Sequence, residues 1–333
     1  MKRIPLSVLD LAPLRQGAHA SAAFAESIEL SRHVEALGYR RHWFAEHHAM
    51  PGIASAAPAV LIARVAAATS TIRVGSGGVM LPNHAPLAIA EQFGTLEALF
   101  PGRIDLGIGR APGTDPLTAS PLVREDPTSG EGLPPLLDEL HGFFRGEFGA
   151  DHAYHGIRAV PALGNEPPIW LLGSSGYSAK VAGRRGLPFA FAHLFSQVNT
   201  LPALKLYREL FQPSAALSQP YAMIAATVIV ADTDAEARRL ALPSALAFLR
   251  VRQGKREPYP TLEEAEAHAW TAEERAAAEK WLAQNVVGDP ASVRKQLDEL
   301  LEATRADELM VLCVIPEAEA RKRSYTLLRE LHG

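Results

Sequence analysis

Three polar side chains stand directly behind a short apolar run, in the segment Trp43-Phe44-Ala45-Glu46-His47-His48. A carboxylate beside two imidazoles can transfer a proton, orient a substrate or bind a metal ion. Neighbouring residues of an extended chain point to opposite sides, so these three do not converge as metal ligands must. We therefore interpret Glu46, His47 and His48 as candidate catalytic residues and expect no metal. Histidines that are merely hydrogen-bonded at the edge of the fold are the alternative.

A glycine-rich apolar run follows, from Gly75 to Leu81. Glycines inside a strand cost stability and usually mark a bulge or a close approach of the backbone to another group. Gly77 and Gly78 therefore suit a flat ligand lying against the backbone. Tight packing within the fold would explain them as well.

Two further segments offer groups that bind phosphate. Arg110 follows the apolar run 104–109, where a guanidinium can pair with phosphate oxygens or form a salt bridge. The turn Gly173-Ser174-Ser175-Gly176-Tyr177-Ser178 lies between an expected strand and an expected helix, and its N–H groups and hydroxyls suit a phosphate. A serine N-cap would use the same residues. Because Arg110 follows the neighbouring strand, we favour phosphate.

Strands and helices must alternate along the chain to position these residues. The expected strands are 4–11, 41–48, 72–81, 103–110, 168–172, 188–194, 221–231 and 308–315. The expected helices are 24–37, 58–69, 86–100, 136–144, one that follows the turn over 173–176 and ends at Arg185, 201–211, 235–249, one that begins at Pro290, and 317–331. Most of the strands are continuous apolar runs, as in a sheet that is covered on both faces.

This order predicts an α/β fold, a (β/α)8 TIM barrel with insertions, with its site at the carboxyl ends of the strands. An open doubly wound sheet is the rival, but no Gly-x-Gly-x-x-Gly follows the first strand. We expect residues 1–333 to form one barrel domain. Its irregular parts are a long loop over 111–135, an excursion over 151–167 that suggests a small hairpin, and a charged segment over 252–284.

The composition limits the classes of partner. Of 333 residues 47% are hydrophobic, the formal net charge is −4, and no basic stripe stands out, so nucleic acid is not expected. No run of about 18 apolar residues suggests a membrane span, and residues 1–14 have no signal-peptide pattern. The single cysteine, Cys313, lies in an apolar run and favours a buried thiol in a reducing, cytoplasmic setting.

These segments, in this order, resemble the bacterial luciferase-like monooxygenase family, and the likeness covers essentially the whole chain. It is most specific over residues 43–48, 75–86, 101–110, 173–188, 286–293 and 306–309. The resemblance implies a (β/α)8 barrel, reduced FMN supplied by a separate flavin reductase, O2 and a small organic substrate, often in a homodimer. Some relatives use a deazaflavin and transfer hydride without oxygen. The chain looks closest to single-chain bacterial members.

The resemblance also implies roles for single residues. His47 matches the family's histidine beside the flavin ring, and Glu46 and His48 match its neighbours. Gly77–Gly78 matches a non-prolyl cis peptide under the ring. The cofactor-binding residues expected on this basis are Gly77, Gly78, Met80, Arg110, Ser174, Ser175, Gly176, Tyr177 and Ser178.

One position departs from the light-emitting members, which have a reactive cysteine where this chain has Gly109. Light emission is therefore not expected, and the missing side chain is expected to widen the pocket above the ring. The segment 252–284 falls where the family has a mobile loop over the site, and its high charge and two prolines fit a lid or plain disorder. Candidate pocket walls are Leu6, Ser7, Met80, His84, residues 111–126, His193 and Phe195.

The leading interpretation is an FMN-dependent monooxygenase. A deazaflavin-dependent dehydrogenase on the same barrel and a non-enzymatic flavin-binding protein are the alternatives, because a fold does not fix a function.

Overall fold

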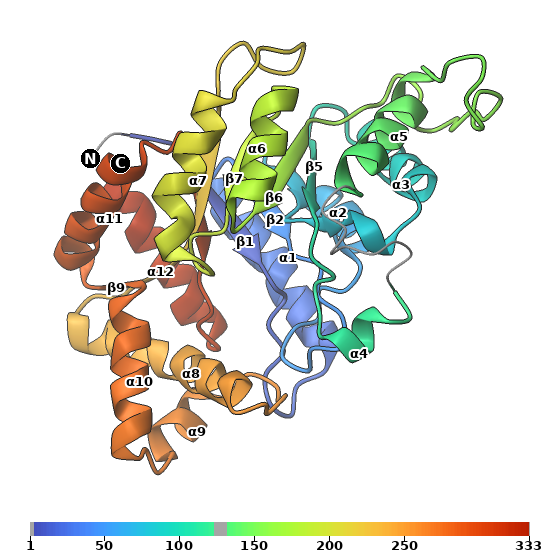
Figure 1. Ribbon diagram of the computed structural model, residues 1–333. Coiled ribbons are helices and arrows are strands. Elements are labelled where there is room, and N and C mark those ends of the chain that lie inside the picture. The colour runs from blue at the N-terminus through green and yellow to red at the C-terminus, as the bar shows by residue number, and fades with distance from the viewer. Residues whose placement is uncertain (1–2, 123–131, 333) are drawn as a thin grey trace.

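Parallel strands close into a barrel (Figure 1) in a computed structural model that describes residues 3–122 and 132–332. Within these ranges, the eight barrel strands are β1 (Leu6–Asp10), β2 (Arg41–Phe44), β3 (Arg73–Ser76), β5 (Ile104–Gly109), β6 (Ile169–Gly173), β7 (Phe189–Phe191), β8 (Ala222–Val230) and β10 (Glu308–Leu312). Each pairs in parallel with its neighbours, and the pairing of β10 with β8 closes the ring. The predicted (β/α)8 barrel is confirmed.

Two short strands lie outside this ring. β4 (Val79–Met80) follows β3 and pairs with β5. β9 (Val286–Gly288) pairs with β8 next to Val228–Val230 and was not among the expected strands. Three residues are too few to show a periodicity, so a sequence pattern does not reveal such a strand.

Helices connect the strands and pack around the barrel (Figure 1). They are α1 (Ala20–Ala36), α2 (Pro58–Ala66), α3 (Pro86–Leu99), α5 (Leu133–Arg145), α6 (Gly176–Arg185), α7 (Gln197–Glu209), α8 (Asp234–Arg252), α11 (Pro290–Thr304) and α12 (Ala318–His332). Four further helices are η1 (Leu81–Asn83), α4 (Pro116–Ala119), α9 (Leu262–Ala267) and α10 (Ala272–Ala283), of which the first three are short. None of these described helices has the length and apolar character that a membrane span requires.

The helix ends follow from local chemistry. Prolines open α2, α3 and α11, where the missing N–H costs no hydrogen bond. The Asp289 side chain caps α11 by accepting a hydrogen bond from the Ser292 N–H at 2.8 Å. Gly38 follows α1 with φ of +76°, which fits the predicted glycine stop.

One prediction for the irregular segments needs correction. The hairpin expected over 151–167 is wrong, because the residues there form turns and no strand. Phe148 and Tyr154 instead pack on Phe143 of α5, with ring centroids 4.9 and 5.6 Å away.

The segment 252–284 is largely helical, since it contains α9 and α10. Capping boxes open both helices, Thr261 with Glu264 and Thr271 with Glu274. Whether this segment moves as a lid remains a prediction.

An ionic network fills the barrel toward the amino ends of its strands. Arg41 contacts Asp105 at 2.8 Å and Glu308 at 2.7 Å, and all three side chains are nearly excluded from solvent. The Ser7 hydroxyl donates to Glu308 within this network. Ser7 is therefore a buried member of this network and does not line a pocket. Leu6 belongs to the apolar core between the barrel and the helices. Both expectations for the pocket are wrong.

An apolar layer lies inside the barrel and includes Trp43, Trp170, Met223 and Met310. Trp43 and Trp170 meet edge to face at 5.2 Å. Along β2 and the residues after it, Arg41 of the ionic network comes first, Trp43 of the apolar layer second and Glu46 third. The apolar layer therefore separates the ionic network from the carboxyl ends of the strands.

Candidate active site

Glu46 lies just beyond β2 and joins two histidines. Its side chain is 1% exposed, and its Oε1 accepts hydrogen bonds from Nε2 of His48 and Nε2 of His84, each at 2.9 Å. Oε2 accepts from the Met80 N–H at 3.2 Å. Because an ionised carboxylate only accepts, both imidazoles carry a proton on Nε2. The carboxylate therefore fixes the tautomer and the direction of both rings.

The Glu46 carboxyl is ionised in this setting. Burial by itself raises the pKa of Glu46, but the hydrogen bonds from His84, His48 and the Met80 N–H outweigh it, so the pKa lies below its usual value. His84 was expected only as a pocket wall. Its role as a partner of Glu46 was missed because the two residues are distant in sequence, and only its place just after the glycine-rich run hinted at it.

His47 points to a different neighbour. Its Nδ1 lies 3.1 Å from the carbonyl oxygen of Gly113, so Nδ1–H donates and Nε2 of the neutral ring is left as an acceptor. Burial lowers the pKa of His47, and the Gly113 carbonyl only partly offsets this. The ring is therefore neutral at pH 7 and can accept a proton through Nε2.

The loop after β5 is held against these residues. Gly113 has φ of +68°, and a Cβ there would lie 2.7 Å from the Glu46 carbonyl oxygen, so only glycine fits. The Thr114 hydroxyl donates to the His48 carbonyl at 2.7 Å. Residues 123–126 of the expected pocket wall lie outside the described residues.

The Gly77–Gly78 peptide is cis, as the resemblance implied. The Gly77 N–H donates to the Phe44 carbonyl at 2.7 Å. A Cβ on Gly77 would lie 2.8 Å from the Leu9 side chain, and one on Gly78 would lie 2.8 Å from the Gly107 carbonyl oxygen. These contacts are internal to the barrel, so tight packing by itself accounts for both glycines.

Gly109 does not leave an open space beside it. A Cβ there would lie 2.9 Å from Sδ of Met80 and 3.1 Å from its Cε. The Met80 thioether therefore fills the volume that a side chain at position 109 would take. The expectation that this glycine widens the pocket is wrong. Cys313 is buried after β10, and burial raises its pKa to about 11, so it supplies no reactive thiol.

Arg110 meets the serine turn, because β5 pairs with β6. Its guanidinium carbon lies 4.3 Å from the centre of the Tyr177 ring. Among the described residues, Arg110 forms no ion pair, and the buried Tyr177 hydroxyl has no hydrogen-bond partner. A cation without an ion pair and a buried hydroxyl without a hydrogen bond, both within the described residues, fit an anion better than a rim salt bridge.

Helix α6 begins at this turn. Ser175 is its N-cap residue, yet its side chain makes no capping hydrogen bond, and Ser178 is 4% exposed. The Ser178 side chain lies over Gly173, where a Cβ would come within 2.7 Å of its hydroxyl. The first N–H groups of α6 have no partner within the helix. The turn over 173–178 and Arg110 therefore fit a phosphate group.

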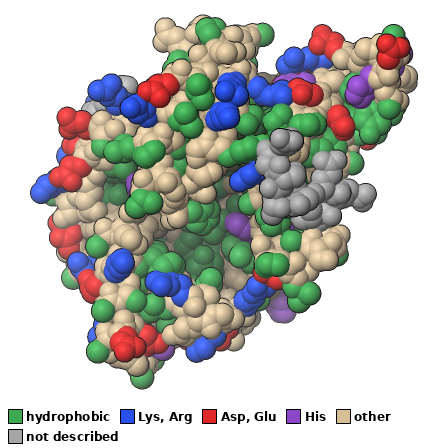
Figure 2. All heavy atoms as spheres, in the orientation of Figure 1, with side chains coloured by type: hydrophobic (Ala, Val, Ile, Leu, Met, Phe, Trp, Pro, Cys, Tyr) green, Lys and Arg blue, Asp and Glu red, His purple; other side chains and the backbone are tan. Residues whose placement is uncertain are grey.

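The remaining expected walls lie in different settings. Nδ1 of His193 is 2.8 Å from the Thr200 hydroxyl, and burial lowers the pKa of His193. Phe195 is 71% exposed and encloses nothing. Arg256, beyond α8, pairs with Asp115 at 2.5 Å and so links the segment 252–284 to the loop after β5. Figure 2 shows a hollow lined by hydrophobic side chains between the positions of α4 and α8.

No group of three His, Cys, Asp or Glu residues that could hold a metal ion occurs in the described ranges 3–122 and 132–332.

This fold and this geometry define a (β/α)8 barrel with a glutamate–histidine cluster, and with a serine turn beside Arg110, at the carboxyl ends of its strands. The family model for luciferase-like monooxygenases matches residues 4–308. The chain is 47% identical to the uncharacterized protein YvbT of Bacillus subtilis, over 98% of this chain and 96% of the relative. It is 45% identical to a luciferase-like monooxygenase of Escherichia coli K12, over 99% of this chain and 97% of that protein. The crystal structure of apo-MsnO8 superposes with a TM-score of 0.90 at 39% identity, covering 98% of each chain.

The chain belongs to the luciferase-like monooxygenase family. Membership supports an oxidoreductase that acts on a small molecule.

Proposed function

We propose that this protein is an FMN-dependent monooxygenase that oxidises a small organic substrate with O2. The observation that carries the proposal is the pairing of Arg110 with the turn over 173–178, because these groups fit the one phosphate of FMN. His47 and Glu46 follow β2, whereas Arg110 and the serine turn follow β5 and β6, at the same end of the barrel. One cofactor could therefore reach from the phosphate site to His47.

The residues would divide the work. Arg110, Ser175 and Ser178 would hold the phosphate, with N–H groups at Gly176 and Tyr177. Gly77, Gly78 and Met80 would face the ring. When bound, reduced FMN supplies the two electrons that let one oxygen atom enter the substrate while the other leaves as water.

The chain itself supplies proton handling and orientation. Nε2 of His47 would accept and return a proton beside the reacting groups, because Nδ1–H is held by the Gly113 carbonyl. Glu46 would keep His48 and His84 in fixed directions. The segment 252–284, linked to the neighbouring loop through Arg256 and Asp115, would exclude water as a lid over the one barrel domain.

A deazaflavin-dependent dehydrogenase is the second candidate. One structural neighbour is an F420-dependent secondary alcohol dehydrogenase, with a TM-score of 0.67 at 14% identity. Another is the oxygenating constituent of 3,6-diketocamphane monooxygenase, in complex with FMN, with a TM-score of 0.73 at 20% identity. Both likenesses concern the fold alone. A sequence relative at 32% identity over 98% of each chain is an N-acetyl-S-alkylcysteine monooxygenase, which favours the oxygenase.

The proposal includes a cellular setting. We propose a cytoplasmic homodimer that receives reduced FMN from a separate flavin reductase. The buried, unpaired Cys313 agrees with a reducing compartment.

Anaerobic titrations with reduced FMN, oxidised FMN and F420 test the cofactor, and 18O2 tests the reaction. We expect reduced FMN to bind, F420 not to bind, and label to enter a product when sulfides and ketones are offered. Hydride transfer from F420 without label would favour the dehydrogenase. Flavin binding without any product from the panel would favour a non-enzymatic protein.

A further inference from the structure

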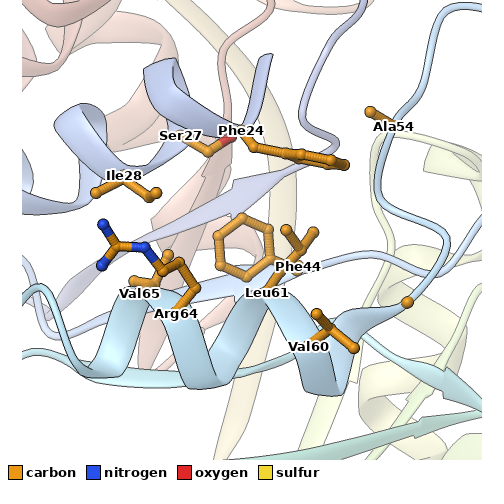
Figure 3. A pocket seen from close by; sticks show the side chains of 10 residues that line it. Phe24, Ser27, Ile28, Phe44, Ala54, Val60, Leu61, Arg64 and Val65 are labelled. Atoms are coloured by element: carbon orange, nitrogen blue, oxygen red, sulfur yellow. The ribbon is translucent and has the colours of Figure 1, made fainter. Parts of the chain in front are cut away.

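A second hollow lies outside the barrel, between α1 and α2. It is a groove partly open to solvent, with a volume of about 480 Å³, a size suited to a small ligand. Apolar side chains form most of its wall, and two polar residues join them (Figure 3). The residues on which the argument depends are Phe24, Ser27, Ile28, Phe44, Leu61 and Arg64. We name this hollow the α1–α2 pocket.

Ser27 is the first sign of a ligand. Its side chain lines the pocket and is 1% exposed, yet its hydroxyl has no hydrogen-bond partner in the described part of the chain. A buried hydroxyl without a partner is costly, so such groups normally meet a protein atom, a water molecule or a ligand. Figure 3 shows this hydroxyl next to the base of the Phe24 side chain, on the pocket side of α1.

Arg64 indicates that the ligand is an anion. It lines the pocket from α2, and within residues 3–122 and 132–332 it forms no ion pair. In Figure 3 its guanidinium lies near Ile28, away from the Phe44 ring. An unpaired guanidinium beside an apolar wall suits a carboxylate.

The apolar walls give the body of the ligand. The Phe24 ring lies above the Phe44 ring in Figure 3, with Leu61 below from α2. An alkyl or aryl group between these side chains would remove apolar surface from water on both sides. We propose that the α1–α2 pocket binds a small monocarboxylate with an apolar body, whose polar atoms reach Arg64 and Ser27.

The α1–α2 pocket is separate from the candidate active site at the strand ends, but Phe44 contacts both regions. The Phe44 ring lines the pocket, whereas the Phe44 carbonyl accepts the hydrogen bond from Gly77 on the barrel side. The α1–α2 pocket therefore lies on the helix side of β2, away from the barrel interior and from the proposed flavin site.

Calorimetric titration of the full chain with octanoate, octanol and octylammonium tests the proposal. We expect octanoate to bind with one site per chain, more tightly than octylammonium. Arg64→Gln should weaken octanoate about fivefold, the upper range for a partly exposed ion pair, and leave octanol unchanged. Arg275→Gln, on the exposed side of α10, is the matched control and should change neither.

A second variant keeps the test sharp. Ala57 lines the pocket at the exposed start of α2, so Ala57→Leu fills part of the space without a buried substitution. It should weaken octanoate and octanol together by about tenfold, since both lose apolar contact. Unchanged FMN affinity in both variants would show that the fold is intact.

Two results would overturn the proposal. Octanoate affinity that survives Ala57→Leu and Arg64→Gln would mean that octanoate binds elsewhere. No octanoate binding, together with a dimer that Ala57→Leu dissociates in sedimentation, would mean that a second copy of the chain covers this face.

Discussion

Replacing Arg110 with methionine removes a charge from the proposed phosphate site while keeping a long side chain over the Tyr177 ring. A hydrogen bond to a charged group contributes about 1.5–3 kcal/mol. Arg110 is partly exposed, so we expect the lower end of this range, about tenfold in Kd. The loss of the contact between Arg110 and Tyr177 should cost the fold about 0.5–1 kcal/mol, or roughly 2 °C in Tm.

The assay compares two ligands that differ only in the phosphate. Titration with FMN should show the tenfold loss in Arg110→Met, whereas the affinity for riboflavin should not change. Arg184→Met, on the exposed side of α6, changes the net charge equally and should leave both affinities as they are. Equal losses for FMN and riboflavin would refute the assignment of Arg110 to the phosphate, and so would no loss for either.

Four further predictions concern the cluster around Glu46, the residues beside it and the segment 252–284. Glu46→Gln should lower the free energy of unfolding in urea by about 1–3 kcal/mol, since the amide keeps one oxygen for the two imidazoles but loses the charge and sets an NH2 donor against the Met80 N–H; an unchanged value would contradict the shared carboxylate. Because burial lowers the pKa of His47, the unfolded chain binds more protons there, and stability is lost as pH falls below the unfolded value of 6.5. His47→Gln should therefore reduce the fall in Tm between about pH 6.5 and pH 5, and a parallel pair of curves would speak against a buried neutral ring. Gly109→Ala should cost about 1 kcal/mol and be partly rescued by Met80→Ala, whereas simple additivity would mean that the two residues do not compete for space. Proteolytic cleavage within 252–284 should decrease with reduced FMN, and equal cleavage with and without it would argue against a lid.

The barrel could be predicted because its signals are local. Continuous apolar runs mark the strands, and prolines at 58, 86 and 290 mark helix starts. The helices inside 252–284 were overlooked although their capping boxes are visible in the sequence. The hairpin over 151–167 was wrong, since this segment forms turns and its Tyr154 packs on Phe143 of α5 instead of on a partner strand.

The site could be predicted only in part. The segment 46–48 and the serine turn stand out because polar residues follow apolar strands. The bond between Glu46 and His84 depends on how the chain after β3 turns back toward β2, which no local pattern shows. Likewise, the Met80 side chain beside Gly109 follows from the pairing of β4 with β5. Contacts between residues far apart in sequence are what the sequence pattern cannot supply.

A crystal structure with FMN tests the central claim most directly. We predict density for the phosphate within about 3 Å of the Arg110 guanidinium and the Ser178 hydroxyl, with the ring against Gly77–Gly78 and facing His47. Density for FMN at any other place, or a phosphate that contacts neither residue, would contradict the account.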